Sequence, residues 1–239
     1  MTWICSGRPP GSQSSFTRKT DVFCRTLALI LAWISLGWTA HAESDNQLWT
    51  SAAVQAQVAA MLKADAGILA RYDQNATEVE RLMPEVKMTL GPVDWLELGV
   101  GVRAMSVRSK SGDREPINRQ HAVVGLEHDV GPVEVAYRFQ YQSKHELDEE
   151  ELVNRIRNRL MLQLDTGTSL KPLLAVELFT DPNSDPVEQK KLRVSAGSRI
   201  KITRRHRLKL RLHHQSSLDG DDETERILCV DYTFRFPKK

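Results

Sequence analysis

Residues Trp95–Met105 read WLELGVGVRAM, and this stretch alternates between apolar side chains and polar or small ones. Leu96 and Leu98 fall on one parity, whereas Glu97 and Arg103 fall on the other. A period of two is the pattern of a β-strand, because successive side chains point to opposite faces of a sheet. The length of the stretch matters as well, since a tilted strand that crosses a bilayer needs about 9 to 11 residues.

The same alternation recurs along most of the chain. Turn-forming residues interrupt it and divide residues 62–236 into ten expected strands. Most of these run longer than the roughly five or six residues that are usual in globular sheets. The expected strands are residues 62–72, 79–90, 95–107, 118–129, 133–144, 151–165, 172–180, 189–202, 206–217 and 224–236.

The connections between the expected strands differ in length at the two ends. Short turns at residues 91–94, 130–132, 166–169 and 203–205 alternate with longer acidic loops at residues 109–117, 145–150, 181–188 and 218–223. This asymmetry is typical of outer-membrane barrels. The sequence therefore predicts an all-β fold: a transmembrane antiparallel up-and-down β-barrel of about 10 strands, with 10–12 as the range.

The N-terminal part predicts export. Arg18, Lys19 and Arg25 precede an apolar run at residues 26–38, and an A-x-A site ends at Ala42. We therefore interpret residues 1–42 as an N-terminal extension and Sec signal peptide cleaved after Ala42. The alternative is an uncleaved anchor helix, but the apolar run is short for a span that needs about 20 residues.

The region that follows the predicted cleavage site has three parts. Residues 62–236 form the expected barrel and residues 237–239 a C-terminal tail. Residues 43–61 are less regular, and an eleventh strand there would leave an odd strand count. We therefore interpret this segment as an N-terminal arm, a plug, or an extra strand of a twelve-strand variant.

Composition and charge exclude several classes of protein. A mean hydropathy of -0.40 excludes a helical membrane bundle, and three cysteines exclude a disulfide scaffold. Cleavage after Ala42 removes four basic residues and one acidic residue, which changes the net charge from +2 to -1. This balance favours neither a nucleic-acid partner nor a polybasic membrane arm. It also leaves Cys229 as the single cysteine.

Alternation alone does not decide which face is outside, because a soluble barrel with an apolar interior has the same period. Export, strand length, loop asymmetry and the last strand favour a membrane barrel. That last strand resembles the C-terminal strand by which the barrel-assembly machinery recognises outer-membrane proteins. The candidate assembly signal is Val230, Tyr232, Phe234 and Phe236, although Pro237, Lys238 and Lys239 follow the final aromatic residue.

If the apolar rows face lipid, the opposite rows line a lumen that is rich in arginine. The candidate charged residues of that lumen are Arg103, Arg138, Arg155, Arg157, Arg159, Glu177, Arg193, Arg199 and Arg211. One interpretation is a salt-bridged interior that stiffens the wall and conducts little. The other is a narrow water-filled pore whose excess arginine favours anions.

Two further functional classes remain as alternatives. A barrel hydrolase acting at the extracellular rim would use residues such as His213, His214, Ser216 and Ser217, although the adjacent histidines point to opposite faces. A soluble periplasmic binding barrel would have its apolar rows inside and its charged rows on the outer surface. The chain has no H-E-x-x-H, G-x-S-x-G or Walker A motif, so we predict no catalytic, cofactor-binding or metal-binding residue and no cofactor.

The chain also resembles a family of bacterial outer-membrane barrels, the domain of unknown function 2490. The likeness runs from Leu48-Trp49 through residues 153–160 (VNRIRNRL) and 176–179 (VELF) to residues 232–236 (YTFRF). The resemblance implies a barrel in the outer membrane of a Gram-negative bacterium and carries no reaction. The expected partners are outer-membrane lipid and lipopolysaccharide, the barrel-assembly machinery and, for a pore, small anionic solutes.

Overall fold

The computed structural model describes residues 45–73, 77–108, 113–146, 152–219 and 224–237. These ranges contain eleven β-strands. The strands are β1 (Asp45–Gln57), β2 (Leu62–Asp73), β3 (Glu78–Val93), β4 (Leu96–Arg108), β5 (Arg114–Val130), β6 (Val133–Glu146), β7 (Leu152–Leu164), β8 (Leu170–Asp181), β9 (Glu188–Lys201), β10 (His206–Ser217) and β11 (Thr224–Arg235). The described part of the chain holds no helix that is long and apolar enough to span a membrane.

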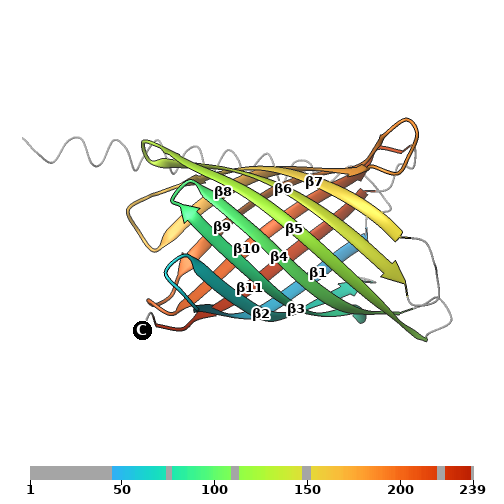
Figure 1. Ribbon diagram of the computed structural model, residues 1–239, viewed down its shortest axis with the longest axis horizontal. Coiled ribbons are helices and arrows are strands. Elements are labelled where there is room, and N and C mark those ends of the chain that lie inside the picture. Colours follow the sequence, from blue (N-terminus) through green and yellow to red (C-terminus); the bar gives the residue numbers. More distant parts are fainter. Residues whose placement is uncertain (1–44, 74–76, 109–112, 147–151, 220–223, 238–239) are drawn as a thin grey trace, which may run out of the picture. The chain divides into compact units, whose positions relative to one another are not determined.

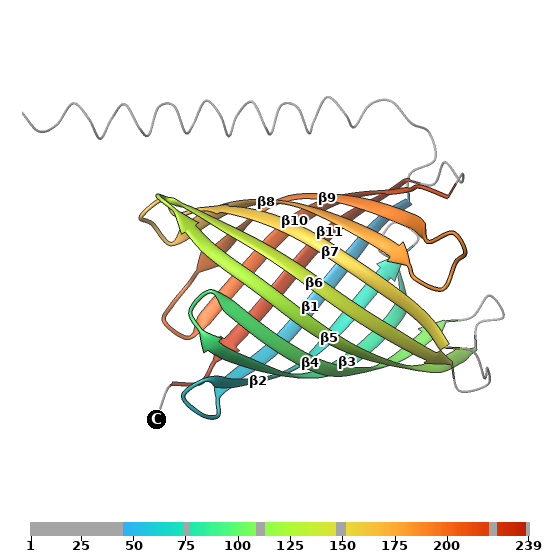
Figure 2. The ribbon, with the colours of Figure 1, turned by 45° about the horizontal axis from the view of Figure 1, so that its top comes forward.

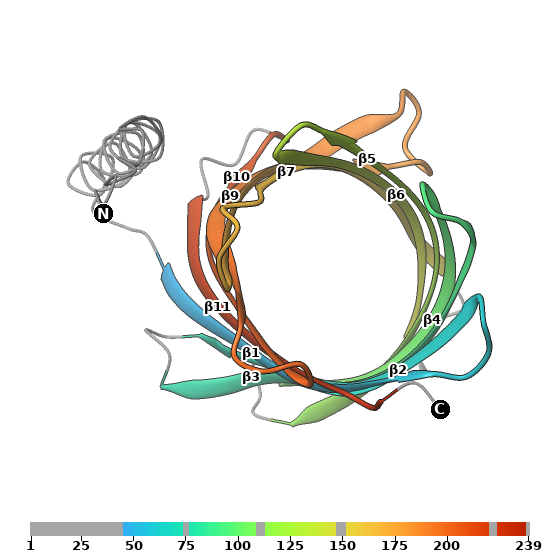
Figure 3. The same cartoon turned by 90° about the vertical axis from the view of Figure 1, so that its left-hand side faces the viewer.

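The strands form a closed barrel in the order β1-β11-β10-β9-β8-β7-β6-β5-β4-β3-β2. They are strongly tilted and close into a ring when viewed along the barrel (Figures 1 and 3). Each strand pairs antiparallel with its neighbours in sequence, and β1 pairs parallel with β11. Closure pairs both edges of the sheet, so backbone groups of every described strand find partners in the adjacent ones.

The alternating pattern predicts β2 to β11 with small errors at the strand ends. β5 begins at Arg114 instead of residue 118, because its pairing with β4 continues as far as Arg108 opposite Arg114. β3 ends at Val93 instead of residue 90, because a register shift lets Val93 pair with Leu96 beyond the irregularity. Cross-strand pairing thus extends strands into sequence that lacks clean alternation.

Residues 45–57, for which an arm, a plug or an extra strand was expected, lie in the wall as β1. An odd number of up-and-down strands makes the first and last strands run in the same direction, so the barrel closes through a parallel pair instead of being wholly antiparallel. Parallel pairing is slightly less stable per residue but still satisfies the backbone. On the inner face the Ser51 hydroxyl donates to Asp231 Oδ1 at 2.7 Å across this seam.

The two ends of the barrel carry different connections. At one end, which we name the turn end, connections of two to five residues join successive strands. At the opposite end, which we name the loop end, the connections have four to six residues. The difference is smaller than the sequence predicts, because the strands reach further toward the loops. Since β1 and β11 are parallel, β1 begins at the loop end and β11 finishes at the turn end (Figure 2).

Turn residues at the turn end explain two tight reversals. Gly131 and Gly167 have φ values of 62° and 69°, a region that residues with a Cβ rarely adopt. Asp165 precedes the second glycine and accepts hydrogen bonds from Lys171 Nζ at 2.7 Å and from the Gly167 backbone N–H at 3.0 Å. These contacts, the Lys171 one first, hold the pKa of the Asp165 carboxyl below its usual value.

The outer face of the barrel is apolar and the inner face is polar. Val100, Val86 and Leu160 point outward with 60%, 53% and 49% of their surface exposed. Polar side chains such as Gln140, Gln163 and Glu177 are buried on the inside. Met83, Met105 and Ile117 form a small apolar cluster on the inner wall. This distribution reverses that of a water-soluble protein, in which the apolar side chains gather in the centre.

Candidate functional site

Two cavities lie inside the barrel, one behind the other. The loop-side cavity has a volume of about 840 Å³ and is lined by residues near the loop end, such as Gln47, Glu115 and Glu225. The turn-side cavity has a volume of about 640 Å³ and is lined by residues near the turn end, such as Met61, Asp94 and Glu127. Together they follow the interior of the barrel from one end toward the other.

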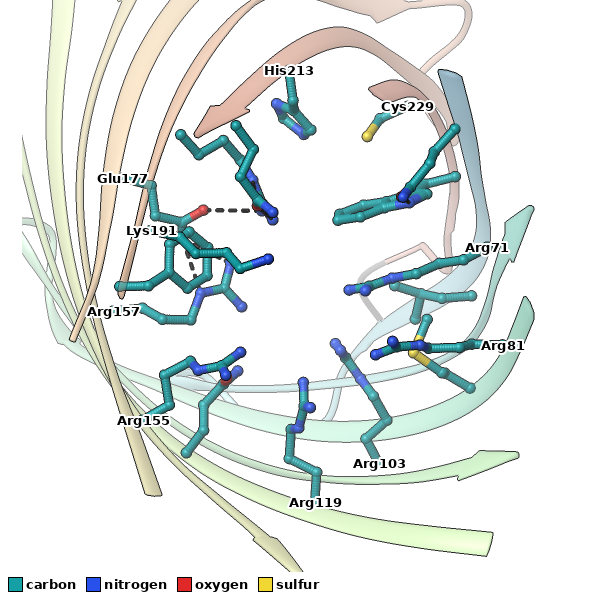
Figure 4. Close-up of a pocket in the computed structure, with 18 of the residues that line it drawn as sticks. Arg71, Arg81, Arg103, Arg119, Arg155, Arg157, Glu177, Lys191, His213 and Cys229 are labelled. Atoms are coloured by element: carbon teal, nitrogen blue, oxygen red, sulfur yellow. Dashed lines mark hydrogen bonds and ion pairs between the residues drawn. The ribbon is translucent and has the colours of Figure 1, made fainter. Parts of the chain in front are cut away.

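Positive charge dominates both cavities. Of the described residues, fourteen arginines and lysines but only five carboxylates line the loop-side cavity. The turn-side cavity has eight basic and four acidic lining residues in the same part of the chain. Figure 4 shows arginines from several strands pointing toward the same central space. Low-dielectric walls concentrate the field of such charges.

The two cavities share six lining residues, and all six are basic. We name this set the basic girdle; it comprises Lys87 of β3, Arg103 of β4, Arg138 of β6, Arg157 and Arg159 of β7, and Lys209 of β10. Because these strands lie on different sides of the ring, the girdle surrounds the place where the cavities meet. Any solute moving from one cavity to the other passes these side chains.

Carboxylates neutralise only part of the girdle. Glu85 binds Arg103 at 2.8 Å, Asp65 lies 3.7 Å from Lys87, and Glu177 binds Arg157 at 2.7 Å. Arg138 and Lys209 form no ion pair with any described residue; Arg138 instead donates to the amide oxygen of Gln140 at 2.6 Å. Within the described ranges, Arg159 likewise has no ion-pair partner, and its one hydrogen bond goes to the sulfur of Met161.

Glu177 is the most deeply placed carboxylate of the loop-side cavity. It is 4% exposed and accepts hydrogen bonds from Arg157 and from Arg193, the latter at 3.3 Å. Arg193 also donates to the side-chain oxygen of Gln215. The carboxylate therefore bridges two arginines on neighbouring strands, which is the arrangement that makes a buried charge tolerable.

Two aromatic rings on the inner wall hold arginine side chains. The Arg71 guanidinium lies 3.8 Å from the centre of the Trp49 ring, and the Arg193 guanidinium lies 5.0 Å from it. Arg193 and Arg157 lie 4.8 Å and 4.9 Å from the Phe179 ring. Cation–π contacts of this kind favour a fixed position of the charges while leaving their N–H groups available.

Like charges face each other directly across several pairs of strands. Hydrogen-bond register places Arg71 opposite Arg81, Arg103 opposite Arg119, Arg138 opposite Arg159, and Lys209 opposite Arg199. Like charges in opposed positions destabilise a sheet. The inner wall therefore contains four directly opposed pairs of like charge.

The structure places all nine candidate lumen residues against the cavities. Eight of them line the loop-side cavity: Arg103, Arg138, Arg155, Arg157, Arg159, Glu177, Arg193 and Arg211. Arg199 lines the turn-side cavity. Sequence reasoning missed Arg119, because it comes second in its expected strand, where alternation is weak. The inward parity that it shares with His121 was the available signal.

The candidate assembly signal lies at the turn end of β11. Val230, Tyr232 and Phe234 have the parity that points away from the cavities, and Phe236 follows the strand with half of its surface exposed. The rings of Phe234 and Phe236 meet edge to face at 5.1 Å, and the Tyr232 hydroxyl lies 2.6 Å from His206 Nδ1. The described outer surface therefore has an aromatic cluster at this end.

The histidines and serines considered for hydrolysis are divided between the inner and outer faces of β10. His213 Nδ1 lies 2.6 Å from Ser195 Oγ, but both residues are buried and Ser195 lines neither cavity. His214 has the opposite parity and lies 3.4 Å from Ser216 Oγ. The described ranges contain no cluster of three or more His, Cys, Asp or Glu residues that would hold a metal ion. Ser195 thus offers no hydroxyl to a solute in either cavity, and the Ser216 hydroxyl lies beside His214 on the outer face of β10.

The model of the family described as "Protein of unknown function (DUF2490)" matches residues 46–225. The match begins within β1 and continues into β11, so it covers nearly the whole wall of the barrel. No curated protein matches the chain.

Proposed function

The chain belongs to the DUF2490 family, which has no assigned function, and from the geometry of the barrel we propose that it is an outer-membrane protein that passes small anions in preference to cations. The observation that carries the proposal is the basic girdle. A passage whose basic residues outnumber their carboxylate partners favours anions, as charged rings do in other pores.

The apolar outer face supports a membrane location. Exposed valines and leucines surround the described wall, and a closed barrel is one of the two architectures that satisfy backbone groups in lipid. The aromatic cluster at the turn end matches the interfacial rings of outer-membrane barrels. We propose that Sec exports the chain and removes residues 1–42, and that the barrel-assembly machinery recognises β11. Lipid and lipopolysaccharide are the proposed partners of the outer face.

A structural barrel is the second candidate. It is favoured by the ion pairs of Glu177, Glu85 and Asp231, which tie neighbouring strands together across the inner wall. Such pairs stiffen the wall, and they also reduce the free space available to water. The two candidates differ in one measurable property, because only the first conducts ions.

Conductance in planar bilayers tests the passage. In a gradient of KCl, we expect current steps whose reversal potential lies on the chloride side of zero. The double substitution Arg138→Glu/Arg159→Glu should move the reversal potential toward potassium, because it reverses two uncompensated charges of the girdle. The matched pair Arg204→Glu/Arg205→Glu lies in an exposed turn outside both cavities and should shift it far less. Silent bilayers would contradict the passage and favour the structural barrel.

The parallel β1–β11 seam predicts an unusual orientation of the two chain ends. If the turn end faces the periplasm, Asn46 at the start of β1 faces the cell exterior. In a Cys229→Ala background, we expect a membrane-impermeant maleimide to label Asn46→Cys in intact cells. Ser169→Cys, in an exposed turn, should react only after the outer membrane is permeabilised. The reverse pattern would contradict this orientation.

A further inference from the structure

Three arginines of the loop-side cavity have no hydrogen-bond acceptor among the described residues. Arg71 lies over the face of the Trp49 ring, and none of Arg71, Arg119 and Arg155 donates a hydrogen bond to any residue of those ranges. Each guanidinium has five N–H donors and stays charged at every physiological pH. All three are half-buried, and none of them forms an ion pair with a carboxylate of the described residues.

These arginines come from well-separated strands and point into one space. Arg71 extends from β2, Arg119 from β5 and Arg155 from β7, and Figure 4 shows their guanidinium groups directed toward the centre of the cavity beside Arg81 and Arg103. Arg81 is opposite Arg71 and Arg103 is opposite Arg119 in register. The cavity thus presents unpartnered donors on several sides of a volume of about 840 Å³, which falls within the range of small-molecule sites.

From this convergence we infer that Arg71, Arg119 and Arg155 bind a phosphate-bearing solute that carries two or more negative charges. The inference rests on the proposed anion passage and names its substrate class. Arginine is the preferred partner of phosphate, because its planar fork donates two parallel hydrogen bonds to two oxygens. Three guanidinium groups without acceptors offer more hydrogen bonds than a chloride ion or a single carboxylate can accept. Two or three phosphate oxygens engage them together.

The fixed position of Arg71 strengthens this assignment. Trp49 holds Arg71 through a cation–π contact, and Arg103 is held by Glu85. A site whose donors are already oriented loses less conformational entropy when a ligand binds. The opposed like charges also disfavour the empty site, so an entering dianion relieves repulsion as well as forming hydrogen bonds.

Calorimetric titration of the purified full chain in detergent micelles with inorganic pyrophosphate tests the inference. We expect saturable binding that the double substitution Arg119→Gln/Arg155→Gln weakens by at least about tenfold, because two charge-assisted contacts are lost. The matched control Arg207→Gln/Arg235→Gln removes the same charge outside both cavities and should leave the affinity unchanged. Arg119→Lys/Arg155→Lys keeps the charge without the fork and should give an intermediate affinity. Heat-modifiable gel mobility confirms that each variant is folded.

The outcomes separate this inference from the proposed function. Absence of saturable pyrophosphate binding, or equal losses in the two matched glutamine pairs, would overturn it. Binding of citrate but not of pyrophosphate would overturn the phosphate assignment. The titration needs no membrane, so it is independent of the conductance measurement. Anion current without pyrophosphate binding would contradict this inference and leave the proposed passage standing. Binding without current would support the site and contradict the passage.

Discussion

A Val100→Arg barrel should be about 2–4 kcal/mol less stable than the wild type when both are refolded into lipid vesicles. Val100 lies on the outer face of β4 with 60% of its surface exposed, and register places it beside Met88 and Ala122. Ala122 is near the middle of β5, so the site lies close to mid-height of the wall. A guanidinium there would face hydrocarbon without water or a partner.

Val130→Arg provides the matched control for depth. Val130 is 59% exposed, nearly the same as Val100, but it is the last residue of β5 at the turn end. An arginine near the interface costs only about 0–1 kcal/mol, because its charged group reaches the headgroups. Urea titrations in vesicles, followed by gel mobility, would measure both variants.

The comparison of these two variants decides whether lipid or water covers the outer face of the barrel. If water covered the outer face, both valines would be ordinary exposed positions, and each substitution would change stability by no more than about 0.5 kcal/mol. Equal and small losses would therefore contradict the membrane location and favour the soluble periplasmic barrel.

Alternation together with turn residues was enough to predict β2 to β11, because most positions of these strands fall into one apolar and one polar row. β1 lacks that contrast, since its outward positions include Ala52 and Ala56 and its inward positions include Ser51 and Ala53. The expectation of an even strand count also argued against it. The parallel pairing with β11 that resolves the odd count depends on ring closure, a non-local property that no local pattern encodes.

The alternation of the sequence predicted which charged residues point into the lumen, but it did not predict which residues they pair with. Register sets Arg159 directly opposite Glu177, yet the carboxylate binds the diagonal neighbour Arg157. Long arginine side chains lean along a strand and reach such diagonal positions. The contact between Trp49 and Arg71 was equally unpredictable, because it requires β1 to lie in the wall next to β2.

The largest expected loss of stability inside the barrel follows from Glu177→Ala. Removing this carboxylate leaves Arg157 and Arg193 without their shared partner in a buried place, and breaking a buried ion pair costs about 3–5 kcal/mol. Glu188→Ala is the control, because its pair with Lys190 is exposed and contributes no more than about 1 kcal/mol. Urea unfolding of the refolded barrels measures both.

A second substitution distinguishes loss of the ion pair from loss of packing. In Glu177→Ala/Arg193→Leu, one of the two orphaned charges is replaced by an apolar side chain that packs against Phe179, the ring that Arg193 contacts in the wild type. Removing both members of a buried pair is far less costly than removing one, so the double variant should recover part of the lost stability. If the double variant were less stable than Glu177→Ala, the carboxylate would act through packing, and charge compensation by Glu177 would not be what stabilises this part of the wall.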